Sequence, residues 1–313
     1  MTTLKCRHCG NNAVINMRHS KLALCESHYI EWFHRQTEKV IKKYNMISHS
    51  DRILLAVSGG KDSLSLWYIL TELGYKVDGL YINLGITEDD YSLKSQSCIE
   101  EFVNKWELNL IVYNIQNEIG YSLIDISQST KRGAGRPCSV CGLIKRHVMN
   151  QISDEQNFNV LATGHNLDDE VATLFSNTLT WSIPMISNQS PVLEATDGFV
   201  RKVKPLFRFY ERETTAYAII QNIQYIYEEC PFSKGSKSIQ YKHIMNDLES
   251  KQPGTKINYF TSFQNAQKKG VFQNNDQISD RYKNKCKSCG QPTTAPDLCA
   301  YCRMIESLKN SVI

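Results

Sequence analysis

The stretch RILLAVSGGKDSLSL (Arg52–Leu66) decides the fold, because it joins a continuous apolar run to a small-residue turn and then to a helical pattern. An apolar run that ends at Ser-Gly-Gly is typical of a buried strand in a parallel sheet. The turn opens a helix, so free backbone N–H groups and the helix dipole face the turn, and phosphate is the natural ligand there. It is not a Walker A loop, since Asp62 stands at the Ser/Thr position and the four-residue spacer between glycines is missing. A glycine-rich βα turn with a chance lysine is the simpler alternative.

Three further segments have the apolar character of buried strands: Lys76–Leu84, Leu108–Ile115 and Phe158–Gly164. Helical patterns separate them, and strands that alternate with helices indicate a doubly wound parallel sheet. We therefore predict an α/β fold whose ligand site lies at the carboxyl ends of the strands. Helices are also expected over Tyr29–Tyr44 and Glu211–Asn222, whereas the chain becomes less regular after Thr180.

Composition places the chain among ordinary globular proteins. Of its 313 residues, 41% are hydrophobic and 22% charged, which excludes the disordered and fibrous classes. The first residues show no secretory pattern, and apolar runs such as Ile53–Val57 are far too short to cross a membrane, so cytoplasmic localisation without a membrane partner is expected. The formal net charge is +4, which counts every cysteine as neutral. Metal-bound thiols are thiolates, and when their charge and that of the bound metals are included, the net charge is about zero. Net charge therefore does not indicate a nucleic-acid partner.

The chain has eleven cysteines, and in a protein without secretory features they indicate metal binding or catalysis rather than disulfides. Two groups at the chain ends have the paired spacing of zinc modules, with Gly10 and Gly290 directly after a pair, where the chain must turn tightly. Each group is a full set of four soft ligands, so both are predicted to be structural zinc sites; chance clustering of buried thiols is the alternative. The N-terminal set is Cys6, Cys9, Cys25 and His28, and the C-terminal set is Cys286, Cys289, Cys299 and Cys302.

A third CxxC pair, Cys138 and Cys141, has no second half close by. A tetrahedral zinc site needs four ligands, and a distant Cys230 also remains outside the two terminal groups. From the residues alone, a third zinc site completed by His147 or Cys98 stays open, as does a redox dithiol that forms a persulfide with Cys230. Outside such a site, Cys98 is interpreted as a buried free thiol.

Several motifs resemble a known family. The loop SGGKDS (Ser58–Ser63) is similar to the pyrophosphate loop of the N-type ATP pyrophosphatases, which cleave ATP between the α and β phosphates. Nearly the whole chain, both zinc modules included, resembles the TtuA-type tRNA 2-thiouridine synthetases of this PP-loop superfamily, which include the archaeal and eukaryotic cytoplasmic tRNA 2-thiolation proteins. The other motifs that carry the resemblance are GRPCSVCGLIKRH (Gly135–His147), ATGHNLDDE (Ala162–Glu170), QSPVL (Gln189–Leu193), GFVRKVKPL (Gly198–Leu206) and EECPFS (Glu228–Ser233).

This resemblance implies an ATP-dependent tRNA sulfurtransferase. ATP would adenylate O2 of a uridine with release of pyrophosphate, and sulfide would then attack C2 and expel AMP, leaving 2-thiouridine. Cys138, Cys141 and Cys230 would bind a 4Fe-4S cluster whose fourth iron has no protein ligand and can hold the sulfide. The family implies tRNA uridine 54 or 34 as the target, a ubiquitin-like carrier with a C-terminal thiocarboxylate as the sulfur donor, and a homodimer.

The resemblance also assigns residues to the nucleotide site. Lys145 and Asp169 match catalytic residues that handle charge and protons near the reacting carbonyl, although a solvated lysine is the alternative for Lys145. Lys61 and Mg²⁺ would stabilise charge on the phosphates, and Asp62 would hold Mg²⁺ or the attacking geometry. The alternative for Asp168 and Asp169 is a pair of helix-start acids that interact with the helix dipole, and Asp168 fits the role of a cap well. The residues expected around ATP are Ala56, Val57, Ser58, Gly59, Gly60, Lys61, Asp62, Ser63, Ile82, Lys145 and Gly164.

The predicted organisation is a zinc module with three cysteine ligands and one histidine ligand (1–30), a PP-loop catalytic domain with the iron–sulfur site (31–265), and a linker with a four-cysteine zinc module (266–313). A tRNA 2-thiocytidine synthetase shares the loop and the cysteines but lacks paired zinc modules at both termini. An ammonia-dependent adenylating ligase on the same loop would leave the three central cysteines without a purpose. A non-catalytic RNA-binding zinc protein would show no ATP–pyrophosphate exchange dependent on Asp62 and tRNA.

Basic clusters surround the cysteine and nucleotide motifs, and an enzyme that acts on tRNA must neutralise phosphates; solvated lysines are the simpler interpretation. The neighbouring Phe207, Phe209 and Tyr210 could stack on a flipped base, with core packing as the alternative. The clusters are Lys131, Arg132 and Arg136; Lys145, Arg146 and His147; Arg201, Lys202, Lys204 and Arg208; and Lys234, Lys237 and Lys242.

Overall fold

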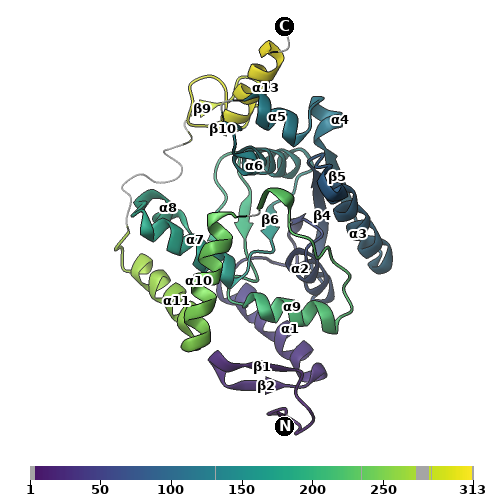
Figure 1. The fold of residues 1–313 in the computed structure, drawn as a ribbon, viewed down its shortest axis with the longest axis vertical. Helices are drawn as coiled ribbons and strands as arrows, with labels where there is room; N and C mark the ends of the chain where they lie inside the picture. Colours follow the sequence, from purple (N-terminus) through teal and green to yellow (C-terminus); the bar gives the residue numbers. More distant parts are fainter. Residues whose placement is uncertain (1–3, 131, 234, 273–281, 283, 312–313) are drawn as a thin grey trace.

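The central sheet has six strands in the order β5-β4-β3-β6-β8-β7 (Figure 1). The computed structural model describes residues 4–130, 132–233, 235–272, 282 and 284–311. Neighbouring strands are parallel except β7 and β8, which form an antiparallel pair at one edge, so the predicted parallel α/β sheet is confirmed with an added edge. The strands are β3 (Arg52–Val57), β4 (Lys76–Asn83), β5 (Leu110–Asn114), β6 (Val160–Thr163), β7 (Val192–Leu193) and β8 (Arg201–Val203).

Both faces of the sheet are covered, which explains why β3 is apolar from Ile53 to its end. Ile53 and Leu55 lie in one core cluster with Trp67 of α2, whereas Leu54 lies in the second cluster with Ile144 of α6. The chain order reverses between β3 and β6, and ligands of open parallel sheets bind at such a reversal. The helices of this domain are α2 (Lys61–Glu72), α3 (Tyr91–Trp106), α4 (Ile115–Ile119), α5 (Leu123–Ser129), α6 (Pro137–Glu155), α7 (Leu167–Leu179), α8 (Ile183–Asn188), α9 (Glu211–Ile220), α10 (Lys237–Lys251) and α11 (Thr255–Lys268), with short 3₁₀ turns at Glu88–Asp90 and Pro231–Ser233.

The N-terminal zinc module is continuous with the first core. Strands β1 (Ile15–Met17) and β2 (Leu22–Leu24), joined by the 3₁₀ turn Arg18–Ser20, lead into α1 (Glu26–Lys43), the helix expected from Tyr29. The module boundary predicted at residue 30 therefore falls inside α1. Phe33 of α1 stacks on Tyr217 of α9 with ring centroids 4.2 Å apart, and the Tyr29 hydroxyl donates to the Glu213 carbonyl at 2.7 Å.

The C-terminal zinc module lies at the opposite end of the long axis, beside α5 and α6 (Figure 1). Its strands β9 (Asn284–Lys285) and β10 (Pro292–Thr293) are followed by α13 (Ala300–Ser311), and Met304 and Leu308 of that helix join the second core cluster. Of the predicted linker, residues 273–281 and 283 lie outside the described residues. None of the described helices is long and apolar enough to cross a membrane.

One carboxyl group is buried between the N-terminal module and the domain. Glu213 of α9 is 3% exposed, and its Oε2 accepts from the Tyr210 backbone N–H at 3.0 Å. Its Oε1 has no hydrogen-bond partner among the described residues, although His19 Nε2 lies 3.6 Å away. Burial raises the pKa of Glu213 to about 8, assisted by Asp168 and Glu249 and opposed by the Tyr210 N–H and Arg212. The folded protein therefore keeps this side chain protonated where a free glutamate would be ionised.

The stability of the wild-type protein should consequently fall as the pH rises from about 4.5 to about 8. In that window the folded state holds a proton on Glu213 that the unfolded state has released, so rising pH favours unfolding. Each unit of pKa difference corresponds to about 1.4 kcal/mol, so a loss of a few kcal/mol is expected from this group. Urea denaturation across that window should show the slope in the wild type and a flatter one in Glu213→Gln, which keeps the acceptor for Tyr210. Equal slopes would show that Glu213 is ionised when folded.

Candidate nucleotide and metal sites

A cavity of about 400 Å³ opens at the carboxyl ends of β3, β4 and β6, a volume within the usual range of small-molecule sites. It lies where the chain order of the sheet reverses, as expected from the sequence. Gly59, Gly60 and Lys61 belong to the adjoining loop but do not line the cavity. The other residues predicted around ATP all do, and so does Asp169: Ala56, Val57, Ser58, Asp62, Ser63, Ile82, Lys145, Gly164 and Asp169.

The loop leaves the N-terminus of α2 open toward this cavity. Gly60 is the N-cap, and no side chain among the described residues caps it. Gly59 has a φ of +77°, which favours glycine. Ser63 holds the turn closed, donating to the Gly60 carbonyl at 3.0 Å while its oxygen accepts from the Ser58 N–H at 3.3 Å. The first N–H groups of α2 are thus available to an anion, and phosphate suits such an uncapped helix start.

Gly164 has a packing reason to be glycine. It follows β6, and a Cβ atom at this position would lie 2.9 Å from the backbone nitrogen of Ser63. Real Cβ atoms do not approach backbone so closely, so a side chain here would push the end of β6 away from the first turn of α2. The missing side chain therefore keeps two walls of the cavity together.

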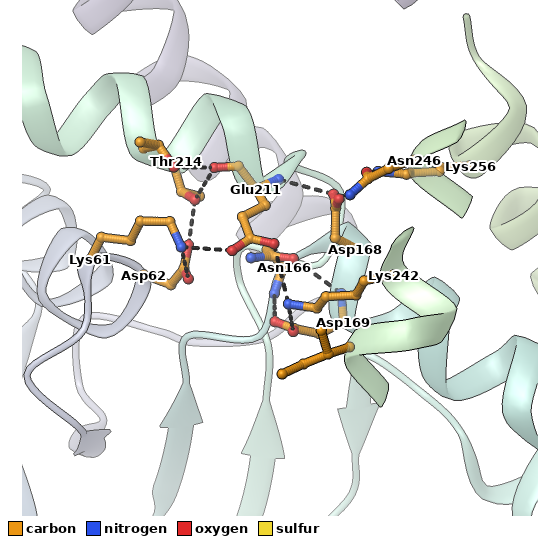
Figure 2. Close-up of polar contacts among 12 residues, drawn as sticks. Lys61, Asp62, Asn166, Asp168, Asp169, Glu211, Thr214, Lys242, Asn246 and Lys256 are labelled. Carbon is orange, nitrogen blue, oxygen red and sulfur yellow. Dashed lines mark hydrogen bonds and ion pairs between the residues drawn. The ribbon is translucent and has the colours of Figure 1, made fainter. Parts of the chain in front are cut away.

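A network of acids and lysines connects Asp62 and Asp169, two residues that line the cavity (Figure 2). Lys61 Nζ lies 3.1 Å from Asp62 Oδ2 and 2.9 Å from Glu211 Oε1. Lys242 Nζ lies 3.2 Å from Glu211 Oε2 and 2.6 Å from Asp169 Oδ1. Glu211 of α9 thus bridges the lysine of the loop and a lysine of α10. The sequence did not predict Glu211, and Lys242 was predicted only as one of several surface cations.

Two opposing effects decide the pKa values in this network: burial disfavours the charged form of a group, and ion pairing favours it. Burial raises the pKa of Asp62, in spite of Lys61 and the Thr214 hydroxyl that donates to its Oδ1. Burial would also raise the pKa of Glu211, but Lys242 and Lys61 outweigh it and hold that pKa at about 2. The two lysines have raised pKa values, because their acidic partners outweigh burial. Glu211 is therefore a fixed anion that keeps both ammonium groups beside the cavity.

The two neighbouring aspartates at the start of α7 make different contacts. Asp169, not Asp168, completes the capping box of α7: its Oδ2 accepts from the Asn166 N–H at 3.0 Å, and Asn166 Oδ1 accepts from the Asp169 N–H at 3.1 Å. The interpretation of Asp168 as a cap of its own helix is therefore wrong. Asp168 is 4% exposed, pairs with the buried Lys256 of α11, and accepts from the Glu211 backbone N–H at 3.0 Å. It joins α7 to α9 and α11 behind the cavity (Figure 2).

The two terminal cysteine groups are assembled for a single metal ion each. In both groups all four ligand atoms lie within 4.8 Å of one another, as four ligands of one zinc ion must. Each group takes two ligands from a helix start: Cys25 caps α1 with His28 in its first turn, and Cys299 precedes α13, which carries Cys302. Gly10 and Gly290 have φ values of +75° and +73°, which confirms the tight turns expected after the CxxC pairs.

The central cysteines gather near the nucleotide cavity with a wider spacing. Cys138 and Cys141 lie in the first turns of α6, and Cys138 Sγ donates to the carbonyl of Phe232, two residues after Cys230, at 3.4 Å. Burial raises the pKa of Cys141; Lys145 opposes that shift, and Cys230 adds to it. Tyr91, which lines the nucleotide cavity, is close enough to Cys230 and Cys141 for both to raise its pKa, after burial. The three cysteines and the cavity therefore form one continuous region.

The described residues do not gather the central cysteines into a third four-ligand zinc group, and the donor set suits an iron–sulfur cluster. Thiolates on one zinc lie about 3.8 Å apart, given Zn–S bonds of about 2.3 Å in a tetrahedron. Among the described residues, no group with ligand atoms within 4.8 Å contains Cys138, Cys141 or Cys230. His147 instead stacks on Tyr301 at 3.7 Å between ring centroids, and Cys98 Sγ donates to the Gln224 carbonyl at 3.5 Å. A set of three thiols without a carboxylate or imidazole is the donor chemistry that iron–sulfur clusters use.

Part of the predicted basic surface is ion-paired within the protein. Lys204 Nζ lies 2.7 Å from the buried Glu170, Arg201 lies 3.0 Å from Glu194, and Lys242 belongs to the network above. These cations are therefore not free for RNA phosphates. Phe207, Phe209 and Tyr210 are buried in the core, which confirms the packing alternative. Cys98 is a free thiol but only half-buried. Lys131 and Lys234 lie outside the described residues.

Comparison with known proteins places the chain among tRNA-thiolating enzymes. It matches the PP-loop domain family over residues 30–234 and the N-terminal LIM domain of the 2-thiouridine synthetase TtuA over residues 5–30. It is 41% identical over 303 residues to the tRNA-5-methyluridine(54) 2-sulfurtransferase of Thermus thermophilus, a match that covers 97% of this chain and 91% of that protein. The protein of the same name from Pyrococcus horikoshii is 38% identical over 96% of this chain and 93% of its own length. The U34-tRNA thiolase NcsA from Methanococcus maripaludis, solved with its 4Fe-4S cluster, shares the fold with a TM-score of 0.79 at 24% identity, over 99% of this chain and 97% of that chain.

Proposed function

This chain belongs to the TtuA-type family of PP-loop tRNA 2-thiouridine synthetases, and from that membership we propose that it is an ATP-dependent tRNA sulfurtransferase that makes 2-thiouridine. The observation that carries the proposal is the shared region at the carboxyl ends of the strands. One cavity is lined by the pyrophosphate loop and by Lys145, which stands one helical turn after Cys141 on α6. Groups that bind a nucleotide and groups that could handle sulfur thus meet at one place.

Activation of the uridine is the first task of this region. The open N-terminus of α2 would bind phosphate oxygens of ATP, and Ile82 would lie against the adenine. Asp62 supplies the carboxylate oxygens that Mg²⁺ prefers as ligands. Lys61 would turn from Glu211 toward the phosphates once ATP arrives, and Glu211 keeps that ammonium group charged and close by until then.

Sulfur transfer is the second task. Cys138, Cys141 and Cys230 would hold a 4Fe-4S cluster, which when bound would offer sulfide from the iron that has no protein ligand. Lys145 would stabilise negative charge at the reacting carbonyl, since its helix position places it between the cysteines and the cavity. Asp169 is already held in orientation by Asn166 and Lys242, as a group that handles a proton at the uridine must be.

We propose uridine 54 as the target, because relatives 36–41% identical to this chain are named for position 54, whereas the position-34 thiolase shares 24%. A ubiquitin-like carrier with a C-terminal thiocarboxylate as the sulfur donor, and a homodimer as the working form, stay predictions from the family resemblance.

Loss of this protein should remove 2-thiouridine from tRNA. We expect nucleosides from a strain that lacks it to contain the unthiolated base at position 54, measured by mass spectrometry of mapped tRNA fragments. Re-expression of the wild-type chain should restore the thiolated base, and re-expression of Lys145→Ala should not. Unchanged 2-thiouridine at both positions 54 and 34 would contradict the proposed function. Loss at position 34 alone would leave the chemistry intact and change the target.

A further inference from the structure

A second cavity, of about 380 Å³, lies on the other side of α6 from the nucleotide site. It is enclosed by α6, by the loop between β7 and β8 together with β8 itself, and by the C-terminal zinc module. Adjacent residues of α6 line different cavities: Lys145 lines the nucleotide site, and Arg146 lines this one. The proposed reaction does not use this second cavity.

The cavity carries three cations that have no acidic partner within the described part of the chain. Arg146, Lys202 and Arg303 line it, and none of the three has an ion pair among the described residues. The acidic residue on its described wall, Glu194, is already paired with Arg201 at 3.0 Å. Burial, with help from Arg146, lowers the pKa of Lys202 to about 8. Three cations held together without counter-charge are costly unless an anion joins them.

The remaining wall offers a flat ring and an unused hydrogen-bond acceptor. Phe199 lies under Lys202, whose Nζ is 5.5 Å from the ring centroid. Asn150 Oδ1 is buried and has no hydrogen-bond partner among the described residues. Asn150 lines the cavity, so a turn of its amide would bring this acceptor to a donor of a ligand, such as an amino group of a base or a ribose 2′-hydroxyl. Cations, an aromatic ring and an acceptor for such a donor together match the parts of a nucleotide.

The zinc module builds one side of this cavity and is held in place by close contact. Cys299, Tyr301 and Arg303 come from the module, and Gln291 Nε2 donates to the His147 carbonyl of α6 at 3.1 Å. Gly198, in the β7–β8 loop with a φ of +79°, lies so close to the module that a Cβ atom there would be 2.4 Å from Pro292 Cγ. The C-terminal module therefore positions Arg303 and Tyr301 against α6.

We propose that this second cavity binds one nucleotide of the tRNA away from the reacting uridine, with its phosphate on Arg146, Lys202 and Arg303 and its base against Phe199. The proposal rests on the proposed function for its choice of ligand. A cavity of this volume accommodates a single nucleotide, and α6 connects that contact to the cysteines and Lys145. The nucleotide would anchor the tRNA while its target uridine enters the neighbouring cavity.

The test is a salt titration of tRNA binding by the full, zinc-loaded protein, using an in vitro transcript of a tRNA. Each lost phosphate contact should flatten the slope of log K against log salt by about 0.7–0.9. We expect Lys202→Ala and Arg303→Ala each to flatten the slope by that amount and to weaken binding about tenfold at physiological salt. Phe199→Leu should weaken binding about fivefold or more without changing the slope, because stacking does not release counterions.

The matched control is Lys287→Ala. Lys287 is another cation of the same zinc module, but it is exposed, outside the cavity, and paired with Asp297. Lys287→Ala should bind tRNA with the wild-type affinity and with the wild-type slope of log K against log salt. Lys202→Ala and Arg303→Ala with wild-type slope and affinity would overturn the phosphate contact, and Phe199→Leu with wild-type affinity would overturn the stacked base. Wild-type protein that binds tRNA no better than it binds a random RNA duplex would instead count against the proposed function.

Discussion

Replacing Cys230 with alanine should abolish formation of 2-thiouridine while both zinc ions stay in place. Cys230 is the third of three thiols that meet near the nucleotide cavity, and two thiolates cannot retain a cluster that leaves one iron open. Removing a partner of a metal ligand already costs about 10–100-fold, so removing a ligand itself should cost more than about 100-fold in thiolation. Iron and zinc per chain should be measured after anaerobic purification. We expect the variant to lose its iron and to keep two zinc ions.

A matched cysteine distinguishes this effect from the loss of any thiol. Cys98 is a free, half-buried thiol whose pKa burial raises to about 11, and it donates to the Gln224 carbonyl. Cys98→Ser keeps that donor and should keep iron content and thiolation. Cys230→Ala with normal thiolation would show that the three-cysteine cluster is wrong. Loss of thiolation in Cys230→Ala, together with wild-type protein that holds no iron after anaerobic purification, would favour the redox dithiol that forms a persulfide with Cys230 instead.

The parts of the fold that local patterns encode could be predicted from the sequence. The apolar run before Ser58 became β3, buried on both faces, and the glycine turn became the open start of α2 beside the predicted cavity. The two terminal four-ligand groups could also be recognised in the sequence. Both ligand pairs of each group lie close in the chain, and each second pair lies at a helix start. Such features need no knowledge of distant contacts.

The edge of the sheet and the acid–lysine network were not predictable in the same way. Strands β7 and β8 have two and three residues, too short for any alternating pattern to be recognised. Glu211 lies 150 residues from its partner Lys61, and α10, which brings Lys242 to the network, follows an irregular stretch. Lys242 could be interpreted only as a solvated cation, since a charge reveals its partner only after folding.

Asp168 shows why neighbouring acids mislead. Next to Asp169 at a helix start, it has the position of a cap, but the fold gives that role to Asn166 and Asp169. Asp168 points instead to Lys256, 88 residues further along the chain, and to the first N–H of α9. Local propensity could predict an acid at the helix start; tertiary packing decided which acid served which helix.

Asp62→Asn should reduce adenylation by about 100-fold or more while leaving the protein at least as stable. The side chain is nearly isosteric, and its one amide oxygen can still accept from Thr214, whereas the amide nitrogen replaces the oxygen that accepts from Lys61. Asparagine cannot supply the carboxylate that Mg²⁺ prefers, and it leaves Lys61 paired with Glu211 alone. Burial raises the pKa of Asp62, so ionising its carboxyl group carries a cost that the neutral amide does not have.

The measurement pairs ATP–pyrophosphate exchange in the presence of tRNA with the thermal midpoint of the same preparation. Exchange should fall about 100-fold or more, and the midpoint should stay or rise, as is common where a charged group serves activity rather than stability. Asp247→Asn is the control, because Asp247 lies on the exposed side of α10 and pairs with Lys251 one turn away. Its exchange rate should match that of the wild type. Normal exchange in Asp62→Asn would remove Asp62 from the reaction, and a lowered midpoint would show that its charge holds the loop together rather than serving ATP.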